Sequence, residues 1–261
     1  MDLGLHGRRA LITGASRGIG FAVAEALAAE GAAVGLVARD AAGLGAAAGR
    51  LESRGVPVAT ATADVTDTPQ LKRAVDDIAT ALGGLDHLVA NAGGTVGRGN
   101  LTSAGDGDFT ATFALNAGHA AELIRAGLTH LRAAGGGSVV IISSITGMRP
   151  APRTAYAAAK AAEIHLAATA AQELAPAGIR VNAVSPGSIM FPGGGWDTFR
   201  REHPEDVATF LASQVPFGRL GLPEEVADVV SFLLSARASW ITGANVAVDG
   251  GQIYPSARRF D

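Results

Sequence analysis

The segment from residue 155 to residue 162 reads AYAAAKAA and places one tyrosine and one lysine on an otherwise bare alanine run. The chain has only two tyrosines, Tyr156 and Tyr254, and only two lysines, Lys72 and Lys160. Residues four apart share one face of a helix. A phenol ionises near pH ~10, and a neighbouring ammonium favours the phenolate. The pair therefore predicts a tyrosine that exchanges a proton with a carbonyl or alcohol oxygen.

Two hydroxyls follow the apolar run VVII, at Ser143 and Ser144. In open α/β sheets, ligands bind at the carboxyl ends of the strands. A serine at such an end can hold a substrate oxygen beside the tyrosine. Turn formation at a strand end explains the other serine, and the sequence leaves open which is which.

A second candidate site lies near the amino terminus, where RRALITGASRGIG runs from a buried strand into a helix. Gly14, Gly18 and Gly20 give the spacing GxxxGxG rather than GxGxxG. Glycines at such a turn let the backbone approach a phosphate, and the helix N-terminus offers free N–H groups. The segment predicts a dinucleotide site, with a glycine-rich turn that binds nothing as the alternative.

The residues about twenty positions further on decide which dinucleotide fits, because an acid there binds the ribose 2′-hydroxyl and an arginine a 2′-phosphate. The strand ends with Ala38, Arg39 and Asp40. Asp40 precedes a helix and is expected to cap it. Arg39 and Arg17 are both placed to reach one phosphate, which favours NADP(H) over NAD(H).

Short apolar runs alternate with alanine-rich segments of helical length. Continuous apolar runs indicate strands buried on both faces, and strand-helix alternation indicates βαβ units. We predict one α/β domain, 1–261, with a doubly wound, parallel, seven-stranded Rossmann-type sheet and helices on both faces. The strands are expected at 9–13, 33–38, 56–61, 85–91, 137–143, 179–185 and 245–249, and the helices at 18–30, 41–54, 68–82, 109–133, 154–175 and 223–235.

The segment 188–220 interrupts this alternation with a glycine triplet, a short amphipathic stretch and a proline. We expect a lid over the substrate. Its large apolar groups, Met190, Phe191, Trp196 and Phe199, suit a flap closing over an apolar compound, although packing within the core would also explain them.

Composition excludes several classes of function. The net charge of -3 leaves no basic face for nucleic acid, and the absence of cysteine excludes thiolate chemistry. The six histidines show no ligand spacing, so no metal site is expected. Without a leader pattern or an apolar run of about 18 residues, a cytoplasmic protein with no membrane partner is expected.

Together these residues resemble the short-chain dehydrogenase/reductase family, and members similar to 3-oxoacyl-ACP reductase in particular. The resemblance covers nearly the whole chain. It rests on TGASRGIG (13–20), ADV (63–65), NAG (91–93), Asn116 in FALNAG, SSITG (143–147), YAAAK (156–160), PG (186–187) and VDGG (248–251).

The resemblance implies an oxidoreductase that interconverts a carbonyl and an alcohol with NADP(H). It implies that Tyr156 is the acid/base, that Lys160 assists it and binds the cofactor ribose, that Ser144 orients the carbonyl, and that Asn116 holds a water in a proton relay. The implied cofactor-binding residues are Gly14, Ser16, Arg17, Gly18, Ile19, Gly20, Arg39, Asp64, Val65, Asn91, Ala92, Gly93, Tyr156, Lys160, Pro186, Gly187 and Ile189.

The chain departs from the family pattern twice. Ser144 and Tyr156 are 12 residues apart, one fewer than is common, which keeps Ser143 as a second candidate. The threonine expected shortly after Pro186 and Gly187 is missing.

The family also implies a homotetramer, and Met148 is a further candidate for the substrate pocket. The alternative function is a non-catalytic dinucleotide-binding regulator or scaffold.

Overall fold

A computed structural model describes residues 2–97 and 100–257 of the chain. In this described part, seven strands form one sheet in the order β3-β2-β1-β4-β5-β6-β7, and every neighbouring pair is parallel. The strands are β1 (Arg9–Thr13), β2 (Ala33–Ala38), β3 (Val58–Thr62), β4 (His87–Ala90), β5 (Gly137–Ile142), β6 (Ile179–Pro186) and β7 (Asn245–Val248). The predicted Rossmann-type fold is confirmed.

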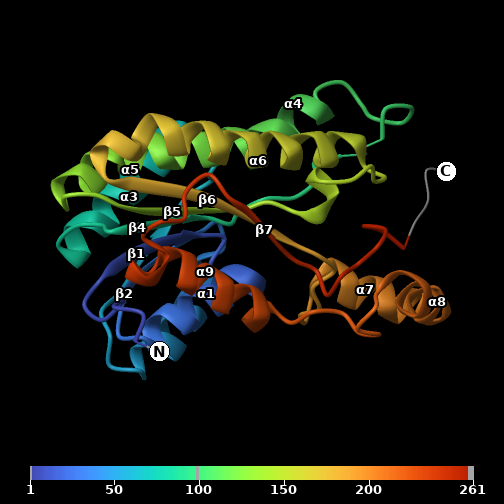
Figure 1. Cartoon of the computed structure of the whole chain (residues 1–261), viewed down its shortest axis with the longest axis horizontal. Helices are drawn as coiled ribbons and strands as arrows, with labels where there is room; N and C mark the ends of the chain where they lie inside the picture. Colours follow the sequence, from blue (N-terminus) through green and yellow to red (C-terminus); the bar gives the residue numbers. More distant parts are fainter. Residues whose placement is uncertain (1, 98–99, 258–261) are drawn as a thin grey trace.

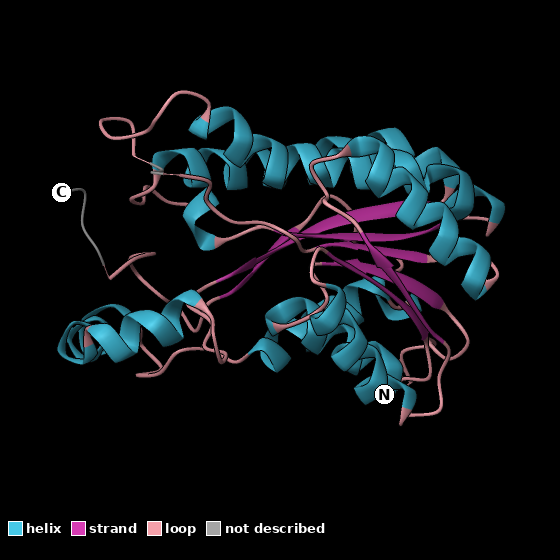
Figure 2. Cartoon of the chain, turned by 180° about the vertical axis from the view of Figure 1, so that it is seen from behind, coloured by secondary structure: helices cyan, strands magenta, loops and turns pink. Residues whose placement is uncertain are grey.

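Helices cover both faces of the sheet, with α3, α5 and α6 on one face and α1, α2 and α9 on the other (Figures 1 and 2). The continuous apolar strands therefore pack against helices on each side, which is why they lack alternation. The helices are α1 (Gly18–Ala29), α2 (Ala41–Glu52), α3 (Thr68–Leu82), α4 (Asp108–Phe113), α5 (His119–Ala133), α6 (Thr154–Leu174), α7 (Gly195–Glu202), α8 (Pro204–Gln214) and α9 (Pro223–Leu234). Short 3-10 turns, η2 (Ile145–Gly147), η3 (Ala175–Ala177) and η4 (Ala236–Ala238), join some of them.

The strand order reverses between β1 and β4, where the chain passes to opposite faces of the sheet. Asn91, directly after β4, clamps this point: its Nδ2 donates to the carbonyl oxygens of Thr13 at 2.9 Å and Gly14 at 3.2 Å. Open α/β sheets bind ligands at such reversals. The clamp thus fixes the ends of two strands where a dinucleotide is expected.

Most predicted bounds agree with the structure to within one or two residues, and the exception is the helix expected over 109–133. There the chain forms α4, then one π-helical turn, η1 (Ala114–Gly118), then α5. A π-turn inserts one extra residue into a helix, frequently at functional sites. Hydrophobic periodicity does not reveal it, because the helix continues in nearly the same direction.

The segment predicted as a lid folds into α7 and α8 beyond the carboxyl end of the sheet, at the right of Figure 1. Two of its aromatic rings, those of Trp196 and Phe210, stack with 5.0 Å between their centroids. Met190 also packs against this small cluster, which has its centre in Phe210, Val215 and Leu220. For Trp196 and Met190, packing within the protein is therefore the arrangement found.

Candidate active site

Tyr156 and Lys160 lie in the first two turns of α6, a helix whose alanines leave room for close packing. The Lys160 ammonium Nζ is 5.6 Å from the centre of the Tyr156 ring. Lys160 is 3% exposed, and its Nζ donates to the Ile142 carbonyl oxygen at 2.9 Å. Tyr156 is half-buried, and its hydroxyl has no hydrogen-bond partner among the described residues. The phenol is therefore available to a substrate while the ammonium is held beneath it.

Asn116 occupies the π-turn and is fully buried. Its Nδ2 donates to the carbonyl oxygens of Gly94 at 2.8 Å and Thr112 at 2.6 Å, and its Oδ1 accepts from the Gly94 N–H at 3.1 Å. A Cβ on Gly93 would lie 2.7 Å from Asn116 Oδ1 and 3.1 Å from Lys160 Nζ. The loop after β4, the π-turn and α6 therefore converge on the lysine.

The two serines at the end of β5 have different surroundings. Ser143 is buried, and its Oγ donates to the Lys160 carbonyl oxygen at 2.7 Å. Ser144 is partly exposed, and its Oγ accepts from the Thr146 N–H at 3.2 Å, which leaves its own proton for another acceptor. A Cβ on Gly147 would lie 2.6 Å from the Lys160 carbonyl carbon, so η2 can rest directly on α6.

The glycine-rich loop lies between β1 and α1. Gly14 and Gly18 have φ angles of +66° and +57°, a conformation that favours glycine. A Cβ on Gly20 would lie 2.4 Å from Asn91 Nδ2, so only a glycine allows this approach. No side chain in the described structure caps α1, whose N-cap is Arg17. The first-turn N–H groups are left for an anion.

The residues expected to select the cofactor, Arg17, Arg39 and Asp40, have different partners in the structure. Asp40 caps α2 by accepting from the Ala42 N–H at 3.1 Å, as expected. Arg39 is exposed, and its charge helps to lower the pKa of Asp64, after the larger effect of the Thr66 hydrogen bonds. Arg17 donates instead to the Gly193 carbonyl oxygen in the lid at 3.2 Å. Arg17 thus contacts the lid segment, whereas Arg39 lies near Asp64, which follows β3.

The segment after β6 joins the lid to this loop. Gly187 lies so close to Asp249 that a Cβ would be 2.8 Å from its Cα, and the Ser188 N–H donates to Gln252 at 3.0 Å. Ile189 is buried, while the Phe191 ring lies 2.9 Å from where a Gly18 Cβ would be. Phe191 therefore covers the glycine-rich loop rather than entering the core of the lid.

Two functional candidates escaped the sequence analysis, Glu163 and His119. Glu163 is 1% exposed and its Oε2 lies 2.9 Å from Lys160 Nζ. His119 is 1% exposed, and burial, then the Lys160 charge, lowers its pKa to about 3. The spacing i, i+4, i+7 from Tyr156 could have revealed Glu163, because those positions share one helix face.

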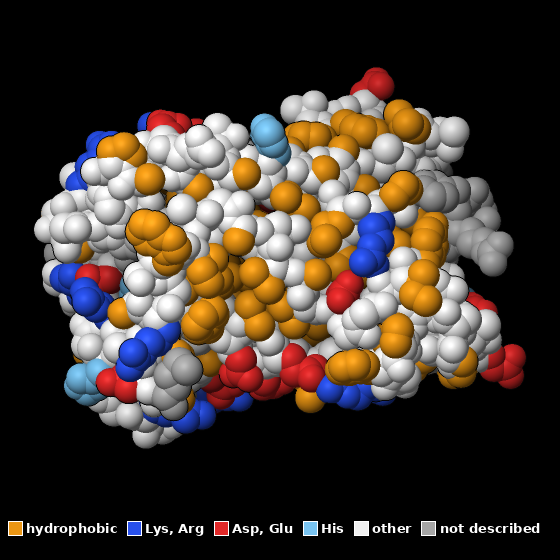
Figure 3. Space-filling model, viewed as in Figure 1, with side chains coloured by type: hydrophobic (Ala, Val, Ile, Leu, Met, Phe, Trp, Pro, Cys, Tyr) orange, Lys and Arg blue, Asp and Glu red, His pale blue; other side chains and the backbone are white. Residues whose placement is uncertain are grey.

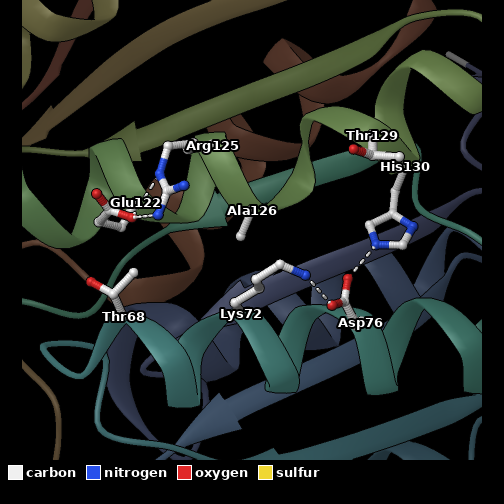
Figure 4. Close-up of a pocket in the computed structure, with 8 residues that line it drawn as sticks. All are labelled: Thr68, Lys72, Asp76, Glu122, Arg125, Ala126, Thr129 and His130. Carbon is white, nitrogen blue, oxygen red and sulfur yellow. Dashed lines mark hydrogen bonds and ion pairs between the residues drawn. The ribbon is translucent and has the colours of Figure 1, made fainter.

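A surface hollow between α3 and α5 is separate from this site (Figure 4). Its charged groups are satisfied by one another: Asp76 accepts from Lys72 at 2.6 Å and from His130 at 2.9 Å, and Glu122 pairs with Arg125. A solvated network of ion pairs therefore accounts for the charged side chains that line this hollow. Across the described residues, no three His, Asp or Glu side chains are grouped to hold a metal ion.

The geometry joins a half-buried phenol, a buried ammonium and an uncapped helix N-terminus at one end of a parallel sheet. A family model described as enoyl-(acyl carrier protein) reductase matches residues 14–252. The chain belongs to the short-chain dehydrogenase/reductase family. It is an oxidoreductase that acts on alcohol and carbonyl groups with a nicotinamide dinucleotide.

Similar curated members of the family include two bacterial enzymes. Cis-4-hydroxycyclohexanecarboxylate dehydrogenase of Sinomonas cyclohexanicum is 38% identical over 245 residues, which cover 94% of this chain and 96% of that protein. The 3-oxoacyl-[acyl-carrier-protein] reductase FabG of Thermotoga maritima is 36% identical over 252 residues, which cover 95% and 99%. The expected likeness to 3-oxoacyl-ACP reductases is confirmed.

Solved structures of family members are also similar to this chain over nearly its whole length. A 7α-hydroxysteroid dehydrogenase complexed with NADH and 7-oxo glycochenodeoxycholic acid superposes with a TM-score of 0.91 and 29% identity, covering 98% of both chains. L-sorbose reductase from Gluconobacter frateurii, complexed with NADPH and L-sorbose, gives 0.88 and 34%, covering 97% of this chain and 99% of the other. Family members of this fold therefore bind either dinucleotide.

The described residues fit such a dinucleotide. The first turn of α1 has no side-chain cap among these residues and Gly18 has a left-handed φ, so free N–H groups there would suit its phosphates. Asn91 fixes the loop there, and the Lys160 ammonium lies beside Gly93, where it would contact a bound cofactor. In the described part of the chain, no helix is both long and apolar enough to cross a membrane.

Proposed function

We propose that the chain is an NADP(H)-dependent oxidoreductase that interconverts a carbonyl and an alcohol, with Tyr156 as its acid/base. One observation supports this most strongly. The Lys160 ammonium is buried beneath the half-buried Tyr156 ring, between the Asn116 turn and the end of β5. A charge placed there favours the phenolate, so the phenol can give a proton to a carbonyl oxygen and regain one from an alcohol.

The chain's own residues then act as follows in reduction. Ser144 donates a hydrogen bond to the substrate carbonyl oxygen and so orients it, while keeping its own proton. Tyr156 donates the proton that completes the alcohol, and Lys160 offsets the charge left on the phenol. Asn116 keeps the π-turn open toward the lysine, where water can resupply the proton. NADP(H), when bound, supplies the hydride.

The preference for NADP(H) is supported by Arg39, which is exposed directly after β2 beside Asp64, and by Ala38, which brings no negative charge. We propose that Arg39 binds the 2′-phosphate and that Arg17 joins it when the lid moves. The loop 14–20, Asp64, Val65, the segment 91–93 and the segment 186–189 would hold the remainder of the cofactor.

The proposed substrate is an apolar ketone, either cyclic or a 3-oxoacyl thioester. The names of the relatives support both classes, since they include a cyclohexane derivative, a steroid and an acyl-carrier-protein substrate. Met148, 43% exposed next to η2, and Phe217, 73% exposed after α8, offer apolar contacts. A sugar, as in the sorbose enzyme, remains the contrasting class for the test.

The deciding experiment follows NADPH oxidation by absorbance against cyclic ketones, 3-oxoacyl thioesters and ketoses, with NADH in parallel. We expect turnover with NADPH on an apolar ketone and a loss of at least about 10²-fold in Tyr156→Phe. Tyr254→Phe is the matched control and should keep full activity. Undiminished turnover in Tyr156→Phe would rule out the mechanism, and tight NADPH binding without any turnover would favour a non-catalytic dinucleotide-binding protein.

Arg39→Ala tests the cofactor preference in the same assay. Loss of a charge-assisted contact to a phosphate should weaken NADPH binding by about tenfold or more and leave NADH nearly unchanged. Arg17→Ala should do less, because Arg17 contacts the lid. Equal effects of Arg39→Ala on both cofactors would contradict the assignment.

We also propose that the protein is cytoplasmic and works as a homotetramer. Exposed apolar groups support an assembly: Trp240 is 98% exposed and Phe232 is 36% exposed. Apolar side chains gather in the middle of the face in Figure 3, where Figure 1 places α9 and β7. Analytical ultracentrifugation should show four copies, and a monomer at micromolar concentration would contradict this.

A further inference from the structure

Glu163 is a buried carboxylate that the mechanism above does not use. It follows Tyr156 and Lys160 at i+7 and i+3, so the three side chains form one stripe along α6. Its Oε1 accepts from Lys160 Nζ at 3.1 Å, and its Oε2 lies 2.9 Å from the same nitrogen. The carboxylate is 1% exposed and the lysine 3% exposed. The ion pair is therefore shielded from water and from salt.

The groups around Lys160 leave the carboxylate as its principal counter-charge. From β5, the Ile142 carbonyl oxygen accepts from Nζ, and the neutral Ser143 hydroxyl lies beside the Glu163 carboxylate. From α5, His119 faces the lysine and stays neutral above about pH 3. On α6, the charged groups acting on Lys160 are Glu163 and Tyr156.

The electrostatics of this cluster depend on the carboxylate. Burial alone would lower the pKa of Lys160, but the Glu163 carboxylate and the Tyr156 phenolate outweigh it and raise that pKa. Burial raises the pKa of Glu163, although the Lys160 charge and the hydrogen bonds of Lys160 and Ser143 act in the opposite direction. A paired ammonium also attracts a phenolate less strongly than an unpaired one does.

We propose that Glu163 is a positioning residue that holds the Lys160 ammonium at the end of β5 and, by offsetting its charge, sets the pH at which the Tyr156 phenol ionises. The inference rests on the proposed roles of Tyr156 and Lys160. Without the carboxylate, the buried ammonium would have Tyr156 as its main counter-charge. The phenol should then ionise at lower pH, by about one pH unit for a charge two helical turns away.

The small number of tyrosines allows this to be measured without any substrate. With ¹³Cζ-labelled tyrosine, the intact protein gives two ring signals whose shifts report ionisation, and Tyr254→Phe assigns them. The Tyr156 signal is titrated in the unsubstituted protein, in Glu163→Gln and in Glu163→Asp. Glu173→Gln makes the same chemical change at an exposed position of α6 and serves as the matched control.

We expect the Tyr156 midpoint to fall by about one pH unit in Glu163→Gln, to return close to its original value in Glu163→Asp, and to stay unchanged in Glu173→Gln. Should the glutamine variant not fold, Glu163→Met provides a second neutral side chain of similar length. An unchanged or higher midpoint in a folded neutral variant would overturn the proposal.

Activity provides a second readout. The pH profile of kcat/KM for ketone reduction should move to lower pH in Glu163→Gln, since reduction requires the protonated phenol. A purely structural role would lower the rate by one factor at every pH, and that result would also overturn the proposal. If no substrate turns over even in the unsubstituted protein, the proposed function fails, while the tyrosine titration still tests the role of Glu163.

Discussion

Ser143 and Ser144 are adjacent in the sequence, yet their hydroxyls have different partners. The Ser143 Oγ is committed to the Lys160 carbonyl oxygen inside the protein, whereas Ser144 keeps a proton to donate. Alternating side-chain directions along an extended backbone explain the difference, because one residue points into the core and the next points toward the site. This assigns Ser144 as the proposed substrate-binding serine.

Substitution of each serine by alanine separates the two roles. Ser144→Ala should lower kcat/KM by about 10²-fold, the usual cost of losing a donor to a developing oxyanion, with unchanged stability. Ser143→Ala should lower the free energy of unfolding by about 1 kcal/mol and change kcat/KM little. Steady-state kinetics and urea unfolding check both. The reverse pattern would return the role to Ser143.

At the scale of elements, the turn between β1 and α1 depends on its glycines and on the lid. Gly18 has a left-handed φ of +57°, and the Phe191 ring covers it. In the described structure, no side chain caps the first turn of α1. Phe191 lies 173 residues after Gly18 in the sequence, in the segment expected to be a lid.

Gly18→Ala should therefore lower the free energy of unfolding by about 1–2 kcal/mol and weaken NADPH binding by about tenfold. Gly55→Ala is the matched control, because Gly55 also has a left-handed φ, of +75°, but open space around it. It should lose similar stability and keep full affinity. Calorimetric titration and urea unfolding measure the two quantities, and equal affinities in both variants would contradict the phosphate site.

At the scale of the whole molecule, two buried histidines link stability to pH. Burial lowers the pKa of His87 to about 4, and burial with the Lys160 charge lowers that of His119 to about 3. In the unfolded chain a histidine gains its proton near pH ~6.5. The unfolded state therefore binds more protons below that pH, and stability falls as the solution becomes more acidic.

We expect the free energy of unfolding to drop by about 3–4 kcal/mol from about pH 7 to about pH 5, from the two histidines together. His87→Leu combined with His119→Leu should flatten this dependence. His165→Leu, at an exposed position of α6, should leave it unchanged. Urea unfolding across this range measures the effect, and an equally steep profile in the double variant would show that other groups cause it.

The sequence alone determined the architecture and predicted which residues carry the proposed chemistry. Apolar runs without alternation specify strands buried on both faces, and their order with the intervening helices allows few topologies. The rare residues Tyr156 and Lys160 at a spacing of four predicted the proposed acid/base pair, since spacing on a helix translates directly into a shared face. The glycines after β1 predicted the proposed phosphate loop for a similar reason, since a tight turn into a helix is a local feature.

Only the tertiary structure decided what touches those residues. The π-turn at Asn116, the Phe191 ring over Gly18 and the separate contacts of Arg17 and Arg39 all join segments distant in sequence. Glu163 lies one helical turn from Lys160. The strength of this ion pair depends on its burial, because a charge pair on an exposed helix face contributes little. Packing of α6 against β5 excludes water from that pair, so the Glu163 carboxylate acts strongly on the Lys160 ammonium.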